Sequence, residues 1–194
     1  MKTVFMFLTI AIVLCIFVII GLLIKIHDIR KKTKYVEEAD MWHKLAVTDD
    51  LTGVYNRNAY NMYVERHRKS GKNEIKGIML FDVDDFKMVN DTHGHTVGDI
   101  VLKRVGEALL EVFPKPQCRV FRIGGDEFAV LSEDVTEKEI IRRLMLLRKR
   151  LDGKEISLSK GYSIIKDNPE KSFRYADEML YADKLSKKSR SNIK

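Results

Sequence analysis

Two short acidic runs interrupt apolar stretches of this 194-residue chain. In the first, an apolar segment ends abruptly in Asp82-Val83-Asp84-Asp85. In the second, the glycine pair Gly124-Gly125 is followed by Asp126 and Glu127 and lies between two apolar segments. Because side chains alternate along a strand, Asp82 and Asp84 are expected on the same side of the first segment. The glycine pair predicts a tight hairpin with Asp126 and Glu127 at its tip.

These acidic runs have the chemistry of a metal site. Carboxylates at a strand end and on a neighbouring hairpin are the hard oxygen ligands that Mg²⁺ prefers, and they leave coordination positions for substrate phosphates. Glycines beside them let a nucleotide approach the backbone closely. Either run alone is more simply an acidic surface turn. Because both occur in one small domain, the sequence predicts a metal–nucleotide site with chemistry resembling two-metal phosphoryl transfer.

The elements expected around this site alternate along the chain. Helices are predicted over about 56–68, over the stretch from 97 to 112, from the T-x-x-E capping box at Thr136 to Leu151, and over about 172–186. Strands are expected over 77–81, 118–123, 127–131 and 156–165. This order predicts an α/β (α+β) fold in which helices flank a mostly antiparallel sheet.

The N-terminal segment predicts a membrane anchor. Residues 4–24 carry no charge and are long enough for one helix to cross a bilayer, so residues 1–24 are expected to be a single transmembrane helix. A cleaved signal peptide fits poorly, because no small-x-small site closes the run. A buried soluble helix is the remaining alternative. Five basic residues follow between 25 and 34, which predicts that the C-terminal side faces the cytoplasm.

Residues 25–47 contain no proline or glycine and carry apolar residues at helical spacing, which predicts a juxtamembrane linker or signalling helix. Its apolar stripe either pairs with a second copy or packs on its own domain, and the sequence leaves both open. The net charge of +7 favours acidic partners in general. A nucleic-acid binder is disfavoured, because no aromatic–basic interleaving is present. Cys15 and Cys118 support neither a disulfide framework nor a zinc site.

Over residues 48–194 the chain resembles the GGDEF family of diguanylate cyclases, through motifs that occur in the family's order. The motifs are Asp49-Asp50-Leu51-Thr52-Gly53 with Asn56-Arg57, Asp82-Val83-Asp84-Asp85-Phe86-Lys87, Asn90-Asp91, Gly94-His95, Gly98-Asp99, Arg122-Ile123-Gly124-Gly125-Asp126-Glu127-Phe128, Ser159-Lys160-Gly161, Ala176-Asp177, Leu180-Tyr181 and Lys184. A lone GGDEF pentapeptide is a weak signal, whereas the ordered set is specific. The resemblance implies a catalytic domain over 48–194 with a palm-like nucleotide-cyclase fold.

The resemblance also implies the reaction and its metal ligands. The family condenses two GTP molecules into cyclic di-GMP, with Mg²⁺ as cofactor and Mn²⁺ as the alternative metal. By similarity, Asp82, Asp126 and the Val83 carbonyl bind the metal, and Asp126 helps to deprotonate the ribose 3′-hydroxyl that attacks the α-phosphate. Glu127 is either an accessory acid of the same site or an electrostatic neighbour.

Substrate contacts follow from the same resemblance. Asn90 and Asp99 match the residues that read the guanine edge, and His95 matches a histidine that lines the substrate site. Lys184 and Lys87 match residues beside the phosphates. Where the family has Gly-Arg, this chain has Lys187-Lys188, so Lys188 is expected to replace the arginine.

The resemblance implies a homodimer, because each site holds one GTP and the product is two-fold symmetric. Together with the predicted anchor, it places the protein in the bacterial inner membrane, with the catalytic domain in the cytoplasm. A catalytically silent module that binds GTP or a partner protein is the alternative.

The chain departs from the family pattern at three places. Lys115 and Cys118 stand where many members carry the R-x-x-D inhibitory site, so this site is expected to be absent. Asn58 replaces a common arginine. Lys160 interrupts a strand and is expected to reach solvent.

Overall fold

The computed structural model describes residues 46–70, 75–153, 155–165 and 169–191, together with Leu22 and Lys25. The chain divides into two units, Met1–Lys44 and Leu45–Lys194. The predicted membrane helix and the predicted helix over 25–47 lie almost wholly outside the described residues. Within the described ranges, no helix is both long enough and apolar enough to cross a bilayer.

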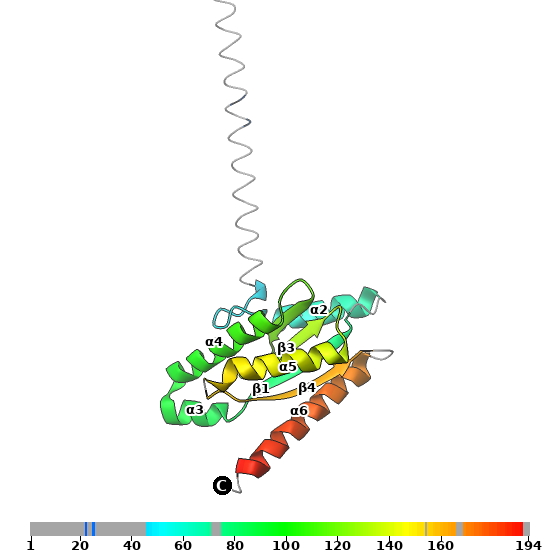
Figure 1. Ribbon diagram of the computed structural model, residues 1–194. Helices are drawn as coiled ribbons and strands as arrows, with labels where there is room; N and C mark the ends of the chain where they lie inside the picture. The colour runs from blue at the N-terminus through cyan, green and yellow to red at the C-terminus, as the bar shows by residue number, and fades with distance from the viewer. Residues whose placement is uncertain are drawn as a thin grey trace, which may run out of the picture. The chain divides into compact units, whose positions relative to one another are not determined.

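The second unit is built on a four-stranded antiparallel sheet (Figure 1). The strands are β1 (Gly77–Val83), β2 (Cys118–Arg122), β3 (Glu127–Ser132) and β4 (Leu158–Ile164), and their order across the sheet is β2-β3-β1-β4. Every residue of β1 is buried, because this strand lies inside the sheet and helices cover both faces. A strand buried on both faces reads as a nearly continuous apolar run, which explains why Asp82 stands out in the sequence.

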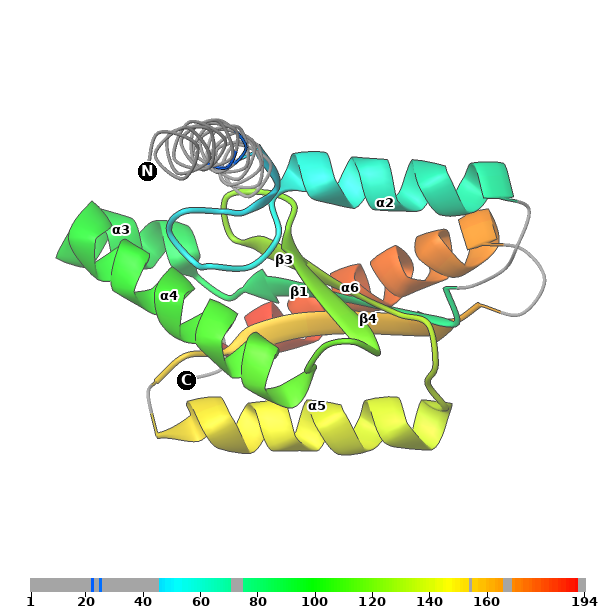
Figure 2. The ribbon, with the colours of Figure 1, turned by 90° about the horizontal axis from the view of Figure 1, so that it is seen from above.

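The helices are α2 (Arg57–Ser70), α3 (Phe86–His93), α4 (His95–Val112), α5 (Glu137–Asp152) and α6 (Pro169–Ser191). Alternation along β1 sends Phe81 to a core shared with α4 and α5, and Leu80 to a second core shared with α2 and α6. Figure 2 shows α2 and α5 on opposite sides of the sheet. The predicted antiparallel sheet between helices is therefore confirmed.

One helix was not predicted. α3 spans eight residues and buries none of them, so it lacks the apolar periodicity that reveals α4 and α5. It begins after Asp85, whose φ of 54° is left-handed, and it ends at Gly94, whose φ is 81°. At α5, by contrast, the expected cap is present, because the Thr136 side chain accepts a hydrogen bond from the Glu139 amide.

Both outer edges of the sheet are covered. Along β4, the Lys160 amide donates to Asp183 Oδ2 at 3.0 Å, and the Lys187 ammonium donates to the Leu158 carbonyl at 2.6 Å. Along β2, Tyr55 donates to the Val120 carbonyl and accepts from the Arg122 amide. Side chains of α6 and the segment before α2 thus pair backbone groups that an edge strand would otherwise leave open.

Gly161 marks the closest approach of β4 to α6. A Cβ atom at this position would lie 1.9 Å from the Ala176 carbonyl oxygen and 2.5 Å from the Leu180 amide nitrogen. These neighbours are backbone atoms, so they cannot rotate away. Only a glycine lets α6 pack at this distance from the sheet.

We therefore expect Gly161→Ala to push α6 away from β4 and to lower the free energy of unfolding by about 1–3 kcal/mol. Native-state hydrogen exchange of the β1 and β4 amides in the full chain measures this loss. Gly153→Ala is the control, because no atom lies within 4 Å of its Cβ position and its φ is −78°. Equal exchange in the two variants would contradict the proposed close packing.

Candidate functional site

The site lies where β1 ends beside the β2–β3 hairpin. Asp82 pairs across the sheet with Glu127, and the Val83 amide donates to the Asp126 carbonyl at 3.1 Å. Strand pairing thus continues one residue beyond β3 and fixes Asp126 next to the end of β1. The two acidic runs that are 44 positions apart in the sequence meet here, as predicted.

Asp82 is the buried carboxylate of this group, with only 7% of the residue exposed. Burial raises its pKa, and the neighbouring carboxylates of Asp126 and Asp84 raise it further. The Lys184 ammonium, 2.6 Å from Asp82 Oδ2, acts in the opposite direction without cancelling the rise. The end of β1 is therefore a place where added positive charge is favourable.

Asp84 lies on the same side of β1 and is held differently. Its carboxylate accepts hydrogen bonds from the Ser157 and Ser159 hydroxyls and from the Lys187 ammonium, which is 2.6 Å away. Burial would raise the pKa of Asp84, but these three donors lower it below its ordinary value. Asp84 is consequently ionised and fully engaged with protein groups.

A cavity of about 490 Å³ opens over these carboxylates. It is lined by Asp82, Asp84, Asp85, Asp91, Asp126, Lys87, Lys184, Lys187 and Lys188, together with Val83, Phe86 and Met88. Every residue predicted to bind metal or phosphate lies in this lining. The sequence predicted no role for the lining residues Asp91 and Met88. Asp85 and Phe86 were named only as members of a family motif, without a function of their own.

The residues predicted to read guanine lie on α3 and α4, outside this lining. The Asn90 side chain packs against Gly98, where a Cβ atom would lie 2.0 Å from Asn90 Oδ1. Asp99 follows Gly98 directly, and both Asp99 and His95 are exposed at the start of α4. The glycine thus lets the Asn90 amide lie next to the turn that carries Asp99.

Glu127 is exposed on the hairpin and turned toward Gly124, whose Cβ position lies 2.3 Å from Glu127 Oε2. It is not part of the cavity lining. Its accessory role therefore stays a prediction.

The donors at the end of β1 suit a hard divalent cation. Within the described ranges, no group of three or more His, Cys, Asp or Glu side chains is arranged to hold a metal ion. Two carboxylates and one backbone carbonyl would supply only part of a coordination shell, and substrate phosphates would have to supply the further oxygen ligands of Mg²⁺. Asp82, Asp126 and the Val83 carbonyl therefore fit the predicted magnesium site.

A family model for the GGDEF domain of diguanylate cyclases matches residues 46–190. The chain belongs to the GGDEF family.

Similar proteins agree with this assignment. DgcJ of Escherichia coli K12, a probable diguanylate cyclase, is 31% identical over 153 residues, which cover 75% of this chain and 31% of that protein. The uncharacterized membrane protein SH2145 of Staphylococcus haemolyticus is 31% identical over 170 residues. The match covers 75% of this chain and 48% of SH2145. The chain therefore spans between about a third and a half of these relatives.

Among solved structures, the GGDEF domain of DgcB from Caulobacter crescentus in complex with c-di-GMP is 27% identical, with a TM-score of 0.66. The match covers 73% of this chain and 91% of that one.

The GGDEF hairpin is held from outside by one arginine. Arg122 donates to the Gly125 carbonyl at 2.7 and 3.1 Å and to both oxygens of Asp49 at 3.2 Å. Asp49 in turn accepts from the amide and hydroxyl of Thr52. The Asp49 motif before α2 is thereby connected to the tip that carries Asp126.

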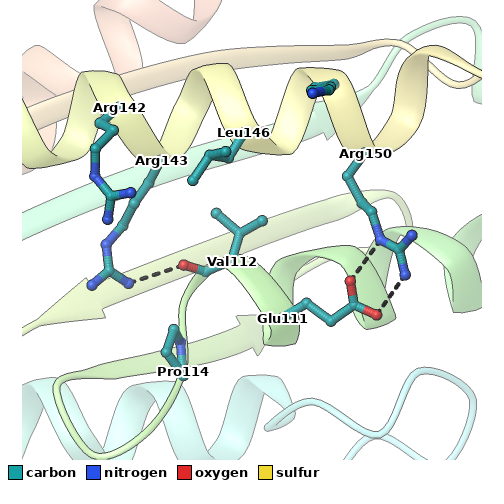
Figure 3. Close-up of a pocket in the computed structure, with 8 residues that line it drawn as sticks. Glu111, Val112, Pro114, Arg142, Arg143, Leu146 and Arg150 are labelled. Carbon is teal, nitrogen blue, oxygen red and sulfur yellow. Dashed lines mark hydrogen bonds and ion pairs between the residues drawn. The ribbon is translucent and has the colours of Figure 1, made fainter.

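A second cavity, of about 590 Å³, lies between α4 and α5 (Figure 3). Its arginines are already paired. Arg150 pairs with Glu111 at 2.6 Å, and Arg143 donates to the Val112 carbonyl at 2.9 Å. Arg142 pairs with Glu139 at 2.8 Å. This cavity contains no aspartate and none of the family's site residues. The residues predicted to bind metal or phosphate line the smaller cavity at the end of β1 instead.

We expect Asp49→Asn to loosen the hairpin and lower the opening free energy of the Ile123 amide, which donates to Glu127, by about 1–3 kcal/mol at pH 7. Burial raises the pKa of Asp49, but the Thr52 hydrogen bonds and the Arg122 ion pair outweigh it and lower the pKa below 3.8. The stabilisation is thus present above pH 3.8 and is lost as the pH falls through the lowered pKa.

Hydrogen exchange of this amide in the full chain measures both effects. Asp50→Asn is the matched control, because Asp50 is exposed and adjacent in sequence. A difference between Asp49→Asn and wild type that grows on acidification would contradict this role.

Proposed function

We propose that this protein is a diguanylate cyclase that condenses two GTP molecules into cyclic di-GMP and two pyrophosphates. The observation that carries the proposal is the cavity in which Asp82 and Asp126 lie beside Lys87, Lys184 and Lys188. Carboxylates for a metal and ammonium groups for a triphosphate are thus combined at one strand end. Membership of the GGDEF family supports the same conclusion.

The chain's own residues bind the triphosphate and receive the proton. Lys184, 33% exposed at its side chain, exchanges Asp82 for a phosphate oxygen, while Lys87 and Lys188 contribute further positive charge. Asp126 accepts the proton of the ribose 3′-hydroxyl. The 3′-oxygen forms a bond to the α-phosphorus of the other GTP, and the bond from that phosphorus to pyrophosphate breaks. Mg²⁺, when bound, supplies Lewis acidity that lowers the pKa of the hydroxyl and offsets charge on the phosphate.

Asn90 and Asp99 provide the selection for guanine. A carboxylate that accepts from the guanine ring N–H and amino group is left unpaired by adenine, which lacks this donor pattern. The exposed position of Asp99 on α4 makes its carboxylate accessible to a base. His95 belongs to the same turn and is proposed to contact the nucleotide.

The reaction requires two copies of the domain, because two GTP molecules must meet in opposite orientations to form a two-fold symmetric ring. The predicted anchor over residues 1–24 would hold the copies in the inner membrane, with the catalytic domains in the cytoplasm. The similarity to SH2145, an uncharacterized membrane protein, supports a membrane location.

A silent module that binds GTP without turnover is the second candidate. The presence of Asp82, Asp126, Asn90, Asp99 and Lys184 in this chain argues against it. The two candidates differ in product formation and not in nucleotide binding.

We expect the full chain in lipid nanodiscs to convert GTP into cyclic di-GMP when Mg²⁺ is present and to stop when EDTA removes it. Asp126→Asn is expected to reduce kcat by about 10²–10³-fold or more, since it removes a metal ligand and a proton acceptor. Chromatographic separation of the products measures this. Asp134→Asn is the control, because Asp134 is exposed and outside the cavity. GTP binding without any cyclic product in wild type would instead support the silent module.

Substrate choice provides a separate expectation. Asp99→Ala is expected to raise KM for GTP by on the order of 100-fold and to reduce the preference for GTP over ATP, because the base loses its acceptor. Competition between the two nucleotides, followed by product analysis, measures the preference. An unchanged GTP-to-ATP ratio would exclude Asp99 from base recognition.

A further inference from the structure

The C-terminal turns of α6 carry a cation that the family pattern does not call for. We infer that Lys187 is a positioning residue: its ion pair with Asp84 fixes the end of α6 so that Lys184 and Lys188 stay over the metal-binding carboxylates. The inference rests on the proposed function and names a further determinant of substrate binding in the same site.

The contacts of Lys187 join α6 to two strand ends. Its ammonium lies 2.6 Å from Asp84 Oδ2 and 2.6 Å from the Leu158 carbonyl, and 3.4 Å from the Ser157 hydroxyl. Asp183, one turn earlier in α6, is 3.7 Å away. Asp84 follows β1 directly, and Leu158 begins β4, so one ammonium ties the helix to both strands.

These acceptors distinguish Lys187 from Lys184, which lies three residues earlier in α6. An ammonium group has three donor hydrogens, and those of Lys187 are directed at protein oxygens. Among the described residues, the Lys184 ammonium donates to Asp82, which is also a predicted metal ligand. Binding of a cation to Asp82 would therefore release Lys184 toward phosphate, whereas Lys187 would keep its place on Asp84.

Core packing does not hold this part of the helix. Ala176 and Leu180 pack in the core beneath the sheet, but none of residues 181–189 is buried. Beyond Leu180, α6 is held to the sheet by polar contacts, chiefly the ion pairs of Lys184 and Lys187 and the acceptance of the Lys160 amide by Asp183. When Lys184 leaves Asp82, the pair of Lys187 with Asp84 becomes the main charged contact that keeps Lys188 at the cavity.

The test is steady-state kinetics of the full chain in nanodiscs with GTP and Mg²⁺. Lys187→Met is expected to raise KM for GTP on the order of tenfold with kcat changed less than about threefold, because displaced lysines weaken triphosphate binding. Asp84→Asn should raise KM similarly, and the double variant should be no worse than either single variant. Lys187→Arg should restore most of the affinity. Arg174→Ala, at a 71% exposed side chain on the same helix, is the control.

The Asp84→Asn variant separates positioning from direct phosphate binding. If Lys187 contacted the phosphates itself, freeing it from Asp84 would leave KM unchanged or lower it, and either result would overturn the inference. Additive effects in the double variant would overturn it as well.

A second readout does not depend on turnover. Hydrogen exchange of amides 184–189 should accelerate in Lys187→Met and not in Arg174→Ala. If wild type makes no product, the proposed function fails, and equilibrium binding of GTP with Mg²⁺ replaces KM. Unchanged exchange together with unchanged GTP binding in Lys187→Met would then refute the positioning role on its own.

Discussion

Asp82 is buried beside Asp84 and Asp126, so desolvation and like charge both oppose its ionisation. A cluster of this kind lowers the stability of a domain unless cations offset it. The fold supplies them from α6, where Lys184 contacts Asp82 in β1 and Lys187 contacts Asp84 just after it. A protein that retained such a cluster for stability alone would gain more from apolar residues at the same positions. The arrangement is understandable if the end of β1 exists to take up positive charge from a ligand.

The remaining architecture serves to bring these charges together. β1 and β3 must pair in one register, because a shift by one residue would turn Asp82 to the opposite face of the sheet. The hairpin must keep its shape, and Arg122 holds its tip from the side of Asp49. α6 must pass close to β4, which Gly161 permits. Each of these features is local, yet all three determine the separation between carboxylates and lysines.

Much of this arrangement could be predicted from the sequence. Continuous apolar runs identified the strands, the glycine pair identified the hairpin, and the acidic runs identified the strand end where the cavity lies. The predicted metal and phosphate residues are all in its lining, because the topology brings the end of β1, the hairpin tip, the start of α3 and the C-terminal turns of α6 together.

What could not be predicted depends on tertiary contacts. α3 buries no residue, so no periodic pattern reveals it. The orientation of the Glu127 side chain toward Gly124 depends on the geometry of the hairpin, which the GGDEF motif alone does not specify. The ion pair of Lys187 with Asp84 is only weakly indicated by the sequence. Asp82 and Asp84 are two residues apart, and Lys184 and Lys187 are three residues apart. Side chains two residues apart on a strand and three residues apart on a helix lie at similar distances from each other. Only the crossing of α6 over β1, however, brings each lysine to its aspartate.

The polar contacts along β4 also bear on how the protein behaves at high concentration. An exposed outer strand is a template on which another chain can add a strand, and this leads to aggregation or unwanted association. Here Asp183 occupies the Lys160 amide and Lys187 occupies the Leu158 carbonyl, both at the end of β4 nearest the site. The helix that delivers lysines to the nucleotide thus also blocks strand addition beside it. The proposed reaction needs two copies that meet in one orientation, and the covered end of β4 disfavours their association by β-sheet extension at that edge.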